Sequence, residues 1–336
     1  MWAMRLHEPG PIETNPLRCE EVPDPVPGEG ALRIDVEVCG VCRTDLHQVE
    51  GDLPMRRRPV IPGHQVVGRV AEVGPGGTSF QPGERVGVAW LHQACKACRF
   101  CRRDRENLCE RGSFTGWTVD GGYAQSIVVP ADFAYRVPGG VSADSLAPLL
   151  CAGIIGYRAL RACPLEPGMT VGLFGFGASA HITLQVAVHL GYAVFVFTRS
   201  EAHRRAAADL GAAWVGGAED DPPRKLDGAV LFAPAGSLVP RALELLAPAA
   251  TVVTAGIHMS DIPPLQYRRH LYEEKVLRSV ANATRRDGRE LLALADVIPI
   301  RTVTHVYPLR EAARALTDLK HSRFTGSAVL NCRAGM

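Results

Sequence analysis

Two patterns of hydrophobic and polar positions divide the chain near residue 150. Before that point, short apolar runs such as 32–38, 65–73 and 85–90 are separated by clusters of Pro and Gly. Short apolar runs between such breaks are typical of β-strands joined by turns. This part is therefore predicted to form a β-rich, barrel-like domain, and the pattern leaves the order of its strands open.

From about residue 153 the pattern changes to alternating strands and helices. Such alternation is typical of βαβ units and predicts a doubly wound parallel sheet, the Rossmann arrangement. The expected elements are strands over 169–174, 193–197, 229–232 and 251–255, an apolar helix ending near 190, and helices over 200–210 and 238–246.

The last segment, from about residue 288, is too short for a third domain. It is predicted to hold a helix near 290–295, a strand near 302–307, a helix near 309–319 and a final strand over 327–330. We therefore expect it to return to the first domain. The predicted organisation is a catalytic domain of residues 1–152 plus 288–336 around a dinucleotide-binding domain of residues 153–287.

Residues 167–198 contain no Asp, Glu, Lys or Arg, which could suggest a membrane span. Gly175, Gly177 and Gly191 interrupt the stretch, and two His and one Gln lie inside it. A buried strand, helix and second strand explain it better.

Composition and charge narrow the function classes. The 336 residues are 46% apolar and 21% charged, with a net charge of +2, so nothing favours a nucleic-acid or anionic-membrane partner. Ten cysteines in a chain of this length, four of them within residues 95–109, fit metal binding in a reducing cytosol better than a disulfide scaffold. The N-terminus lacks an apolar signal core, and we expect a cytoplasmic protein.

A glycine-rich motif lies between the first two strands of the predicted parallel sheet. Gly175, Gly177 and Ala180 form G-x-G-x-x-A, with a strand before it, a helix after it and a second strand about 20 residues on. This context predicts dinucleotide binding, whereas the motif alone could be a tight turn without a ligand. The second strand is followed by Thr198 and Arg199 and by no acidic residue, which favours NADP(H) over NAD(H). The alternative is that the Arg199 side chain stacks on adenine or points to solvent.

A cluster of four cysteines lies in the β-rich part. Four thiolates in one short loop can close a tetrahedral zinc shell, which predicts a structural zinc site. Two local disulfides or four free thiols are the alternatives. Several basic side chains between and beside the thiols would offset their negative charge. The predicted ligands are Cys95, Cys98, Cys101 and Cys109.

A second candidate metal set lies outside that loop. Cys42, His64 and Cys151 would give two Cys and one His with a fourth position open, one of the arrangements of catalytic zinc. Thr44 could pass a proton from whatever the metal binds, and Asp45 could orient a ligand. Alternatively, Cys42 is a small buried hydrophobic residue.

Together these motifs resemble the zinc-dependent medium-chain alcohol dehydrogenases over nearly the whole chain. The resemblance implies a GroES-like catalytic domain interrupted by a nucleotide-binding domain, two Zn²⁺ per chain and a homo-oligomer, a dimer or tetramer. It also implies that Arg43 contacts the cofactor pyrophosphate, that Thr44 and His47 form the proton relay, and that Asp45 braces the histidine ligand. Trp90 and Trp117 fall in segments that line the substrate pocket in relatives.

Two positions depart from the family pattern. Gln65 stands where the family usually has Glu, which affects ligand exchange at the zinc. Ser327 stands where an Arg often serves the pyrophosphate, which leaves more of that task to Arg43.

The resemblance implies hydride transfer between an alcohol or aldehyde and a nicotinamide cofactor. The two tryptophans favour primary alcohols, aromatic ones included, as small-molecule substrates. The alternatives are a polyol, sugar or amino-alcohol dehydrogenase of the same fold, a non-catalytic zinc-stabilised protein, and a zinc-free quinone or alkene reductase.

Overall fold

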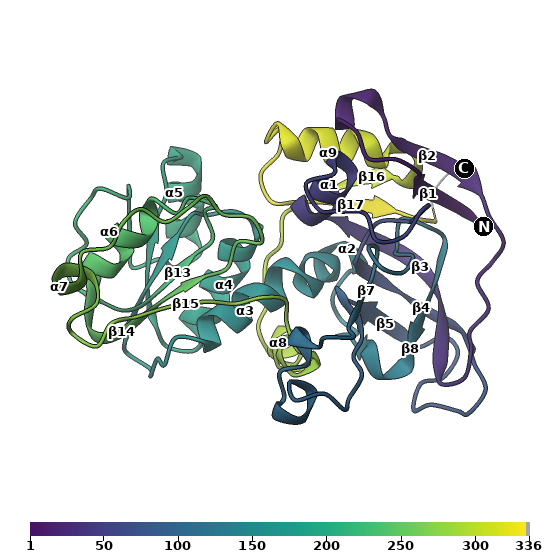
Figure 1. Ribbon diagram of the computed structural model, residues 1–336, viewed down its shortest axis with the longest axis horizontal. Coiled ribbons are helices and arrows are strands. Elements are labelled where there is room, and N and C mark those ends of the chain that lie inside the picture. Colours follow the sequence, from purple (N-terminus) through teal and green to yellow (C-terminus); the bar gives the residue numbers. More distant parts are fainter. Residues whose placement is uncertain (334–336) are drawn as a thin grey trace. The chain divides into compact units, whose positions relative to one another are not determined.

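The computed structural model describes residues 1–333, which form two compact units (Figure 1). The first unit comprises Met1–Cys151, Asn282–Val297 and the chain from Arg301 onward. The second comprises Ala152–Ala281 and the short return Ile298–Ile300. That these units correspond to a catalytic and a cofactor domain stays a prediction.

A mixed seven-stranded sheet is the centre of the first unit. Long apolar strands lie in its middle: every residue of β4 from 65 to 68 is buried, and β3 alternates buried and more exposed positions. β16 and β17 are parallel, and the other pairs are antiparallel. The predicted β-rich domain is confirmed. In the described part of the chain its strands form an open sheet and do not close into a barrel. The order is β16 (Thr304–Pro308), β17 (Ser327–Asn331), β3 (Ala31–Val41), β4 (Gln65–Val73), β5 (Arg85–Val88) and β9 (Ala134–Arg136), with β8 (Ser126–Pro130) on β3.

The C-terminal segment completes this sheet. β17 pairs antiparallel with β3, with Leu330 opposite Cys39, and helix α9 (Ala312–Lys320) packs against β17 (Figure 1). Before these comes helix α8 (Arg285–Val297), longer than the helix predicted near 290–295. The last strand therefore serves the core that the first 150 residues begin.

The rest of the first unit consists of short elements around the sheet. The hydrophobic pattern did not predict the hairpin β1–β2 or helix α1. These elements are β1 (Trp2–Leu6), β2 (Leu17–Glu21), α1 (Arg43–Glu50), β6 (Leu91–Gln93), β7 (Ser113–Phe114) and α2 (Ala143–Leu146), with 3₁₀ turns between them.

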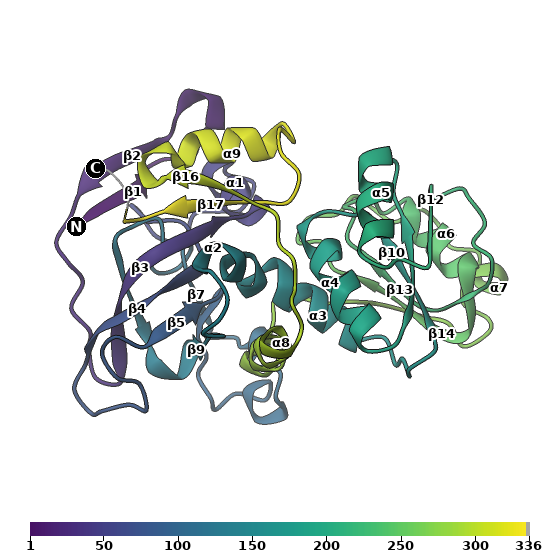
Figure 2. The ribbon, with the colours of Figure 1, turned by 180° about the vertical axis from the view of Figure 1, so that it is seen from behind.

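The second unit is a six-stranded parallel sheet with helices, as predicted (Figure 2). Its strand order is β12-β11-β10-β13-β14-β15, the 3-2-1-4-5-6 order of dinucleotide-binding folds. The strands are β10 (Thr170–Phe174), β11 (Ala193–Phe197), β12 (Trp214–Gly216), β13 (Leu226–Leu231), β14 (Leu246–Thr254) and β15 (Val276–Ser279). The helices are α3 (Ala152–Arg161), α4 (Ala178–His189), α5 (Glu201–Asp209), α6 (Leu238–Leu245) and α7 (Tyr267–His270).

The uncharged stretch 167–198 forms β10, α4 and β11, as its glycines predicted. All five residues of β10 are buried, which explains why no position in that strand is charged. Across residues 1–333, no helix combines the length and the apolar character that crossing a membrane requires.

Candidate active site

Three predicted metal ligands meet at one end of the first unit's sheet. Cys42 follows β3, His64 precedes its antiparallel neighbour β4, and Cys151 follows a short 3₁₀ helix (Ala147–Leu150). His64 Nε2 lies 3.3 Å from Cys151 Sγ, and the sulfurs of Cys42 and Cys151 are 3.8 Å apart. One donor atom from each residue lies within 4.8 Å of the others. Folding therefore brings together ligands that are up to 109 residues apart in the sequence.

The Asp45 carboxylate contacts two of these three residues, His64 and Cys42. Its Oδ1 atom is 3.0 Å from His64 Nδ1, and its Oδ2 atom accepts hydrogen bonds from the Cys42 backbone N–H at 2.9 Å and from the Tyr123 hydroxyl at 3.2 Å. Asp45 and His64 are each 1% exposed. A carboxylate on Nδ1 leaves Nε2 as the nitrogen that faces the two thiols.

Gly63 makes the close approach around His64 possible. Its φ of 95° lies in the left-handed region, which glycine adopts without strain. A Cβ atom there would lie 2.3 Å from the Tyr123 ring and 2.8 Å from Cys39 Sγ. Any larger residue would push Tyr123 away from Asp45.

The charges of this buried set depend on one another. Burial lowers the pKa of His64, but Asp45 and Cys42 outweigh burial and raise it to about 10. A hydrogen bond with Cys151 lowers the pKa of Cys42 well below its usual value despite burial. Cys42 is thus prepared to act as a thiolate, the form that binds metal.

An aromatic wall adjoins His64. The ring of Trp90 meets the His64 imidazole edge-on, with 5.0 Å between centroids, and stacks on Phe114 at 5.5 Å and on Trp117 at 5.9 Å. The indole N–H of Trp117 donates to the Pro54 carbonyl at 2.9 Å. Flat apolar surface therefore lies against the imidazole of this donor set.

The two predicted relay residues lie on helix α1. Thr44 is buried, and its Oγ1 atom lies 3.6 Å from Cys42 Sγ, whereas His47 lies one turn further along the helix. His47 Nδ1 is 2.8 Å from a carboxylate oxygen of Asp52. Arg43, the first residue of α1, is exposed and belongs to the first unit, so its contact with the pyrophosphate stays a prediction.

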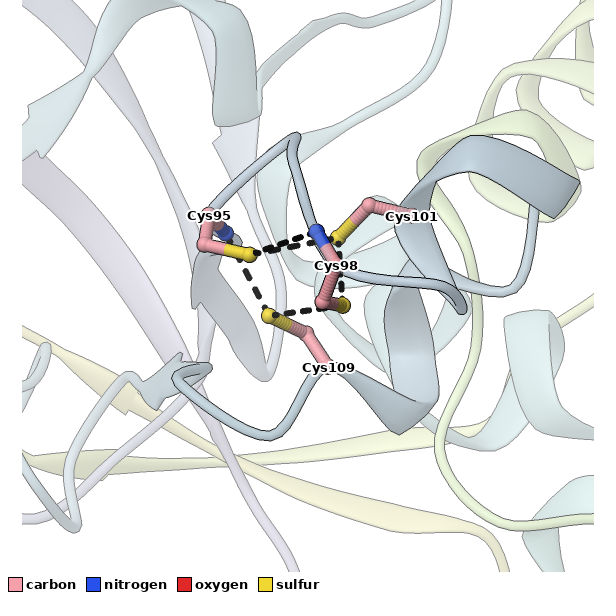
Figure 3. Close-up of side chains that lie close together, drawn as sticks. All are labelled: Cys95, Cys98, Cys101 and Cys109. Atoms are coloured by element: carbon pink, nitrogen blue, oxygen red, sulfur yellow. Dashed lines mark hydrogen bonds between the residues drawn. The ribbon is translucent and has the colours of Figure 1, made fainter.

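The other predicted metal set is also brought together. Figure 3 shows four thiols from one loop converging on a common point. Their sulfurs lie 3.5–3.9 Å apart where they are neighbours, and all are within 4.8 Å of one another. No pair is joined as a disulfide; each of the four is a free thiol. The residues are Cys95, Cys98, Cys101 and Cys109.

Local donors stabilise negative charge in this loop. The backbone N–H groups of Ala97 and Cys98 lower the pKa of Cys95 to about 5. Burial raises the pKa of Cys101 to about 12, so metal binding there would release a proton. Arg111 adds a side-chain donor to Cys95, which raises the pKa of the guanidinium.

The glycine-rich turn lies in the second unit, between β10 and α4. Gly175 has φ 90°, and a Cβ atom on it would lie 2.9 Å from the Ala233 backbone nitrogen. Gly177 is the N-cap of α4 and leaves open space where a side chain would be, while Ala180 is fully buried. The turn thus exposes the N–H groups of the helix N-terminus without a side chain over them.

The residues predicted to select the cofactor follow β11. Thr198 is 8% exposed and donates its backbone N–H to Gly216 at 2.8 Å, and Arg199 is exposed. Ser200 caps α5 by accepting the His203 N–H at 3.3 Å. Thr198 and Arg199, the two candidate contacts to a phosphate, therefore lie at the carboxyl edge of the sheet.

Comparison with known proteins gives the family. Residues 28–139 match the family model described as the alcohol dehydrogenase GroES-like domain. The chain is 50% identical over 337 residues to the probable alcohol dehydrogenase AdhA of Mycobacterium tuberculosis, covering 98% of this chain and 97% of that protein. The chain belongs to the zinc-dependent medium-chain alcohol dehydrogenases. The enzyme is thus an alcohol dehydrogenase, as the sequence predicted.

Solved structures agree with this assignment to the alcohol dehydrogenases. A cinnamyl alcohol dehydrogenase from Sorghum bicolor superposes with a TM-score of 0.89 at 28% identity, covering 100% of this chain and 98% of that one. A cobalt- and zinc-bound thermostable alcohol dehydrogenase from Pyrobaculum aerophilum gives a TM-score of 0.89 at 26% identity, covering 98% and 99%.

Two residues of this alcohol dehydrogenase site were not found from the sequence. Asp52 pairs with His47 because Gly51, with φ 90°, ends α1 and turns the chain back; a helix ended by Gly was a signal for it. Tyr123 reaches Asp45 across 78 residues, and no local pattern indicates such a contact.

Proposed function

We propose that this alcohol dehydrogenase transfers hydride between primary alcohols, aromatic ones included, and NADP(H), with two Zn²⁺ per chain. The observation that carries the proposal is the open donor set of Cys42, His64 and Cys151 beside the wall of Trp90 and Trp117. Flat apolar side chains favour an aromatic or aliphatic alcohol over a polyol, whose hydroxyls would need polar partners.

The residues present fit zinc at both sites. Two sulfurs and one imidazole nitrogen within 4.8 Å suit an ion that binds Cys and His in tetrahedral geometry and leave one position for substrate. Four sulfurs in the 95–109 loop suit a closed, structural shell. The catalytic zinc, when bound, would polarise the substrate oxygen.

The chain's own residues supply orientation and a route for the proton. Asp45 fixes the His64 ring. The Thr44 hydroxyl, beside Cys42, would accept the proton of the substrate hydroxyl while it donates its own proton outward, so that it stays neutral. His47, oriented by Asp52, would receive the proton at the surface end of this route. Trp90 and Trp117 position the substrate body and exclude water.

NADP(H) is proposed for the second unit. The Gly175 turn is a cradle that a Cβ atom would fill, and the N-terminus of α4 favours an anionic pyrophosphate. Thr198 and Arg199, with no acidic residue at the end of β11, favour a 2′-phosphate over free ribose hydroxyls. Arg43 is proposed to contact the pyrophosphate.

The deciding experiment is a panel of alcohols and aldehydes assayed with NADPH and NADH, with a comparison of Arg199→Ala. We expect aromatic and primary substrates with NADPH to give the highest kcat/KM. Arg199→Ala should weaken the binding of NADPH by roughly tenfold to a hundredfold and leave the binding of NADH nearly unchanged, since only NADPH loses a charge-assisted hydrogen bond. Higher activity on polyols, or a clear preference for NADH, would refute the proposal.

Assembly and location are further parts of the proposal. Strand β15 is the outer strand of its sheet, with Val276 44% exposed, and nearby Tyr267 and Tyr272 are 67% and 61% exposed. An apolar edge of this kind supports a homo-oligomer, a dimer or tetramer. Cysteine-rich metal sites support a reducing, cytoplasmic location. Light scattering at several protein concentrations tests the assembly.

A further inference from the structure

Arg204, a residue that the sequence did not single out, lies at the carboxyl edge of the second unit's parallel sheet. It belongs to helix α5, and its Nε atom donates to the Thr198 carbonyl at 3.0 Å, just past the end of β11. Helical side chains lean toward the helix N-terminus, which places this guanidinium over the strand end rather than in solvent. The side chain is 31% exposed.

The neighbouring strand leaves room for this guanidinium. Gly217 follows β12, and a Cβ atom there would lie 3.3 Å from the Arg204 Nη2 atom. Since Thr198 also pairs with Gly216, Arg204 spans the ends of β11 and β12. A backbone carbonyl and a glycine thus hold the group in one place.

The outer nitrogens of Arg204 are only weakly engaged. In the described residues, the ion-pair partner of Arg204 is Glu201, at 3.9 Å from Nη1, and that carboxylate is 67% exposed. A pair of this length on the surface contributes little, so Nη1 and Nη2 remain able to donate to an anion. A planar guanidinium fixed through Nε presents these two donors side by side, which suits phosphate.

The same turn of α5 touches the glycine-rich loop. The His203 ring lies 6.1 Å from the ring of Phe176, which stands between Gly175 and Gly177. In doubly wound sheets the adenosine ribose lies at the end of the second strand, where an Arg accommodates a 2′-phosphate. We propose that Arg204 is a second specificity-determining guanidinium, which binds the cofactor's 2′-phosphate together with Arg199. This rests on the NADP(H) preference proposed above.

The test measures binding of 2′,5′-ADP and 5′-AMP by calorimetry to the whole enzyme, so it needs neither zinc chemistry nor turnover. Arg204→Leu should weaken the binding of 2′,5′-ADP by roughly tenfold or more and leave the binding of 5′-AMP within about twofold of wild type. Arg204→Lys should lie between, because lysine keeps the charge but lacks the planar fork that bonds Thr198 through one nitrogen and offers two others to a phosphate. Arg205→Leu is the matched control: it removes the same charge from the next residue of α5, which is 70% exposed, and should change neither constant.

The outcomes separate the two proposals. If wild-type enzyme binds 2′,5′-ADP no better than 5′-AMP, the NADP(H) preference is wrong, and the role of Arg204 is wrong with it. If wild-type enzyme prefers 2′,5′-ADP but Arg204→Leu keeps the preference, only the role of Arg204 is refuted. Equal weakening of both nucleotides, with a lower melting temperature, would show a structural role and also refute it.

Discussion

Asp45 Oδ1 lies 3.0 Å from His64 Nδ1, and both side chains are 1% exposed. The same carboxylate accepts the Cys42 backbone N–H, so one residue sets the position of two candidate ligands. Its effect on the metal is therefore indirect: it fixes which nitrogen of His64 faces the thiols and how the chain turns at Cys42.

Replacing Asp45 with Asn should loosen the site without removing a ligand. The amide can keep a hydrogen bond to one neighbour but loses the charge that holds His64 in one tautomer. We expect zinc affinity or activity to fall by about 10–100-fold. Zinc competition with a chelator measures it, and Asp35→Asn, which changes a half-exposed carboxylate hydrogen-bonded to Ser126, is the control. An Asp45→Asn enzyme that keeps its zinc and its activity would contradict the bracing role.

The two metal sites should be separable. Cys42→Ala is expected to lose one zinc and activity while the enzyme stays folded, because an open site contributes little to the core. Cys98→Ala should instead lower thermal stability and promote aggregation, since the 95–109 loop depends on its metal for folding. Metal analysis together with thermal unfolding checks this. One zinc or none in active wild-type enzyme would contradict it.

Thr44→Val should keep both zinc ions and NADPH binding but slow turnover. The variant is nearly the same size and removes only the hydroxyl beside Cys42. General acid–base steps contribute roughly a hundredfold or more, and a loss of that size in kcat is expected. Thr14→Val is the control, since the Thr14 hydroxyl is exposed and bonds locally to Pro11. Near-normal kcat at neutral pH in Thr44→Val would show that the proton leaves by another route.

Much of the fold could be predicted because burial leaves a simple pattern. β10 and β11 carry no charged residue and are almost entirely apolar, and the glycine turn between them needs Gly175 at φ 90°. By contrast, β15 was not predicted, because Val276–Ser279 has two apolar residues and lies at the sheet's edge. Hairpin β1–β2 was missed for a similar reason: β2 (Leu17–Glu21) has one buried residue.

The site was predicted in its ligands and not in their support. Helix α1 escaped notice because its N-cap is Cys42, whose sulfur accepts the Thr44 N–H, while sequence rules look for Ser, Thr, Asp or Asn there. Tyr123 on Asp45 and Arg204 on Thr198 depend on contacts that only the folded chain creates. Spacing indicates ligands, but residues that act through other residues leave no spacing to detect.

The cysteine loop is anchored to α8 by an ion pair. Glu106 Oε2 lies 2.6 Å from Arg285 Nη2, and the Arg285 backbone N–H donates to Oε1 at 2.8 Å. The two side chains are 12% and 20% exposed. Burial raises the pKa of Glu106, but these hydrogen bonds outweigh burial and lower it below its usual value.

Because the folded-state pKa of Glu106 is depressed, its ion pair adds stability above the unfolded pKa of about 4.3, and that stability is lost as pH falls through the folded value. Glu106→Gln should therefore reduce the free energy of unfolding by about 1–3 kcal/mol at pH 7, with a difference from wild type that shrinks toward pH 4 and below. Urea unfolding at pH 7 and pH 4 measures this difference.

Glu110→Gln is the control from the same loop. Glu110 is 60% exposed and 3.5 Å from Arg99, so its effect should stay small at both pH values. Zinc loss in acid affects both variants alike, so the difference between them isolates the Glu106 ion pair. A Glu106→Gln difference that persists unchanged at pH 4 would show that packing, not charge, holds the loop to α8.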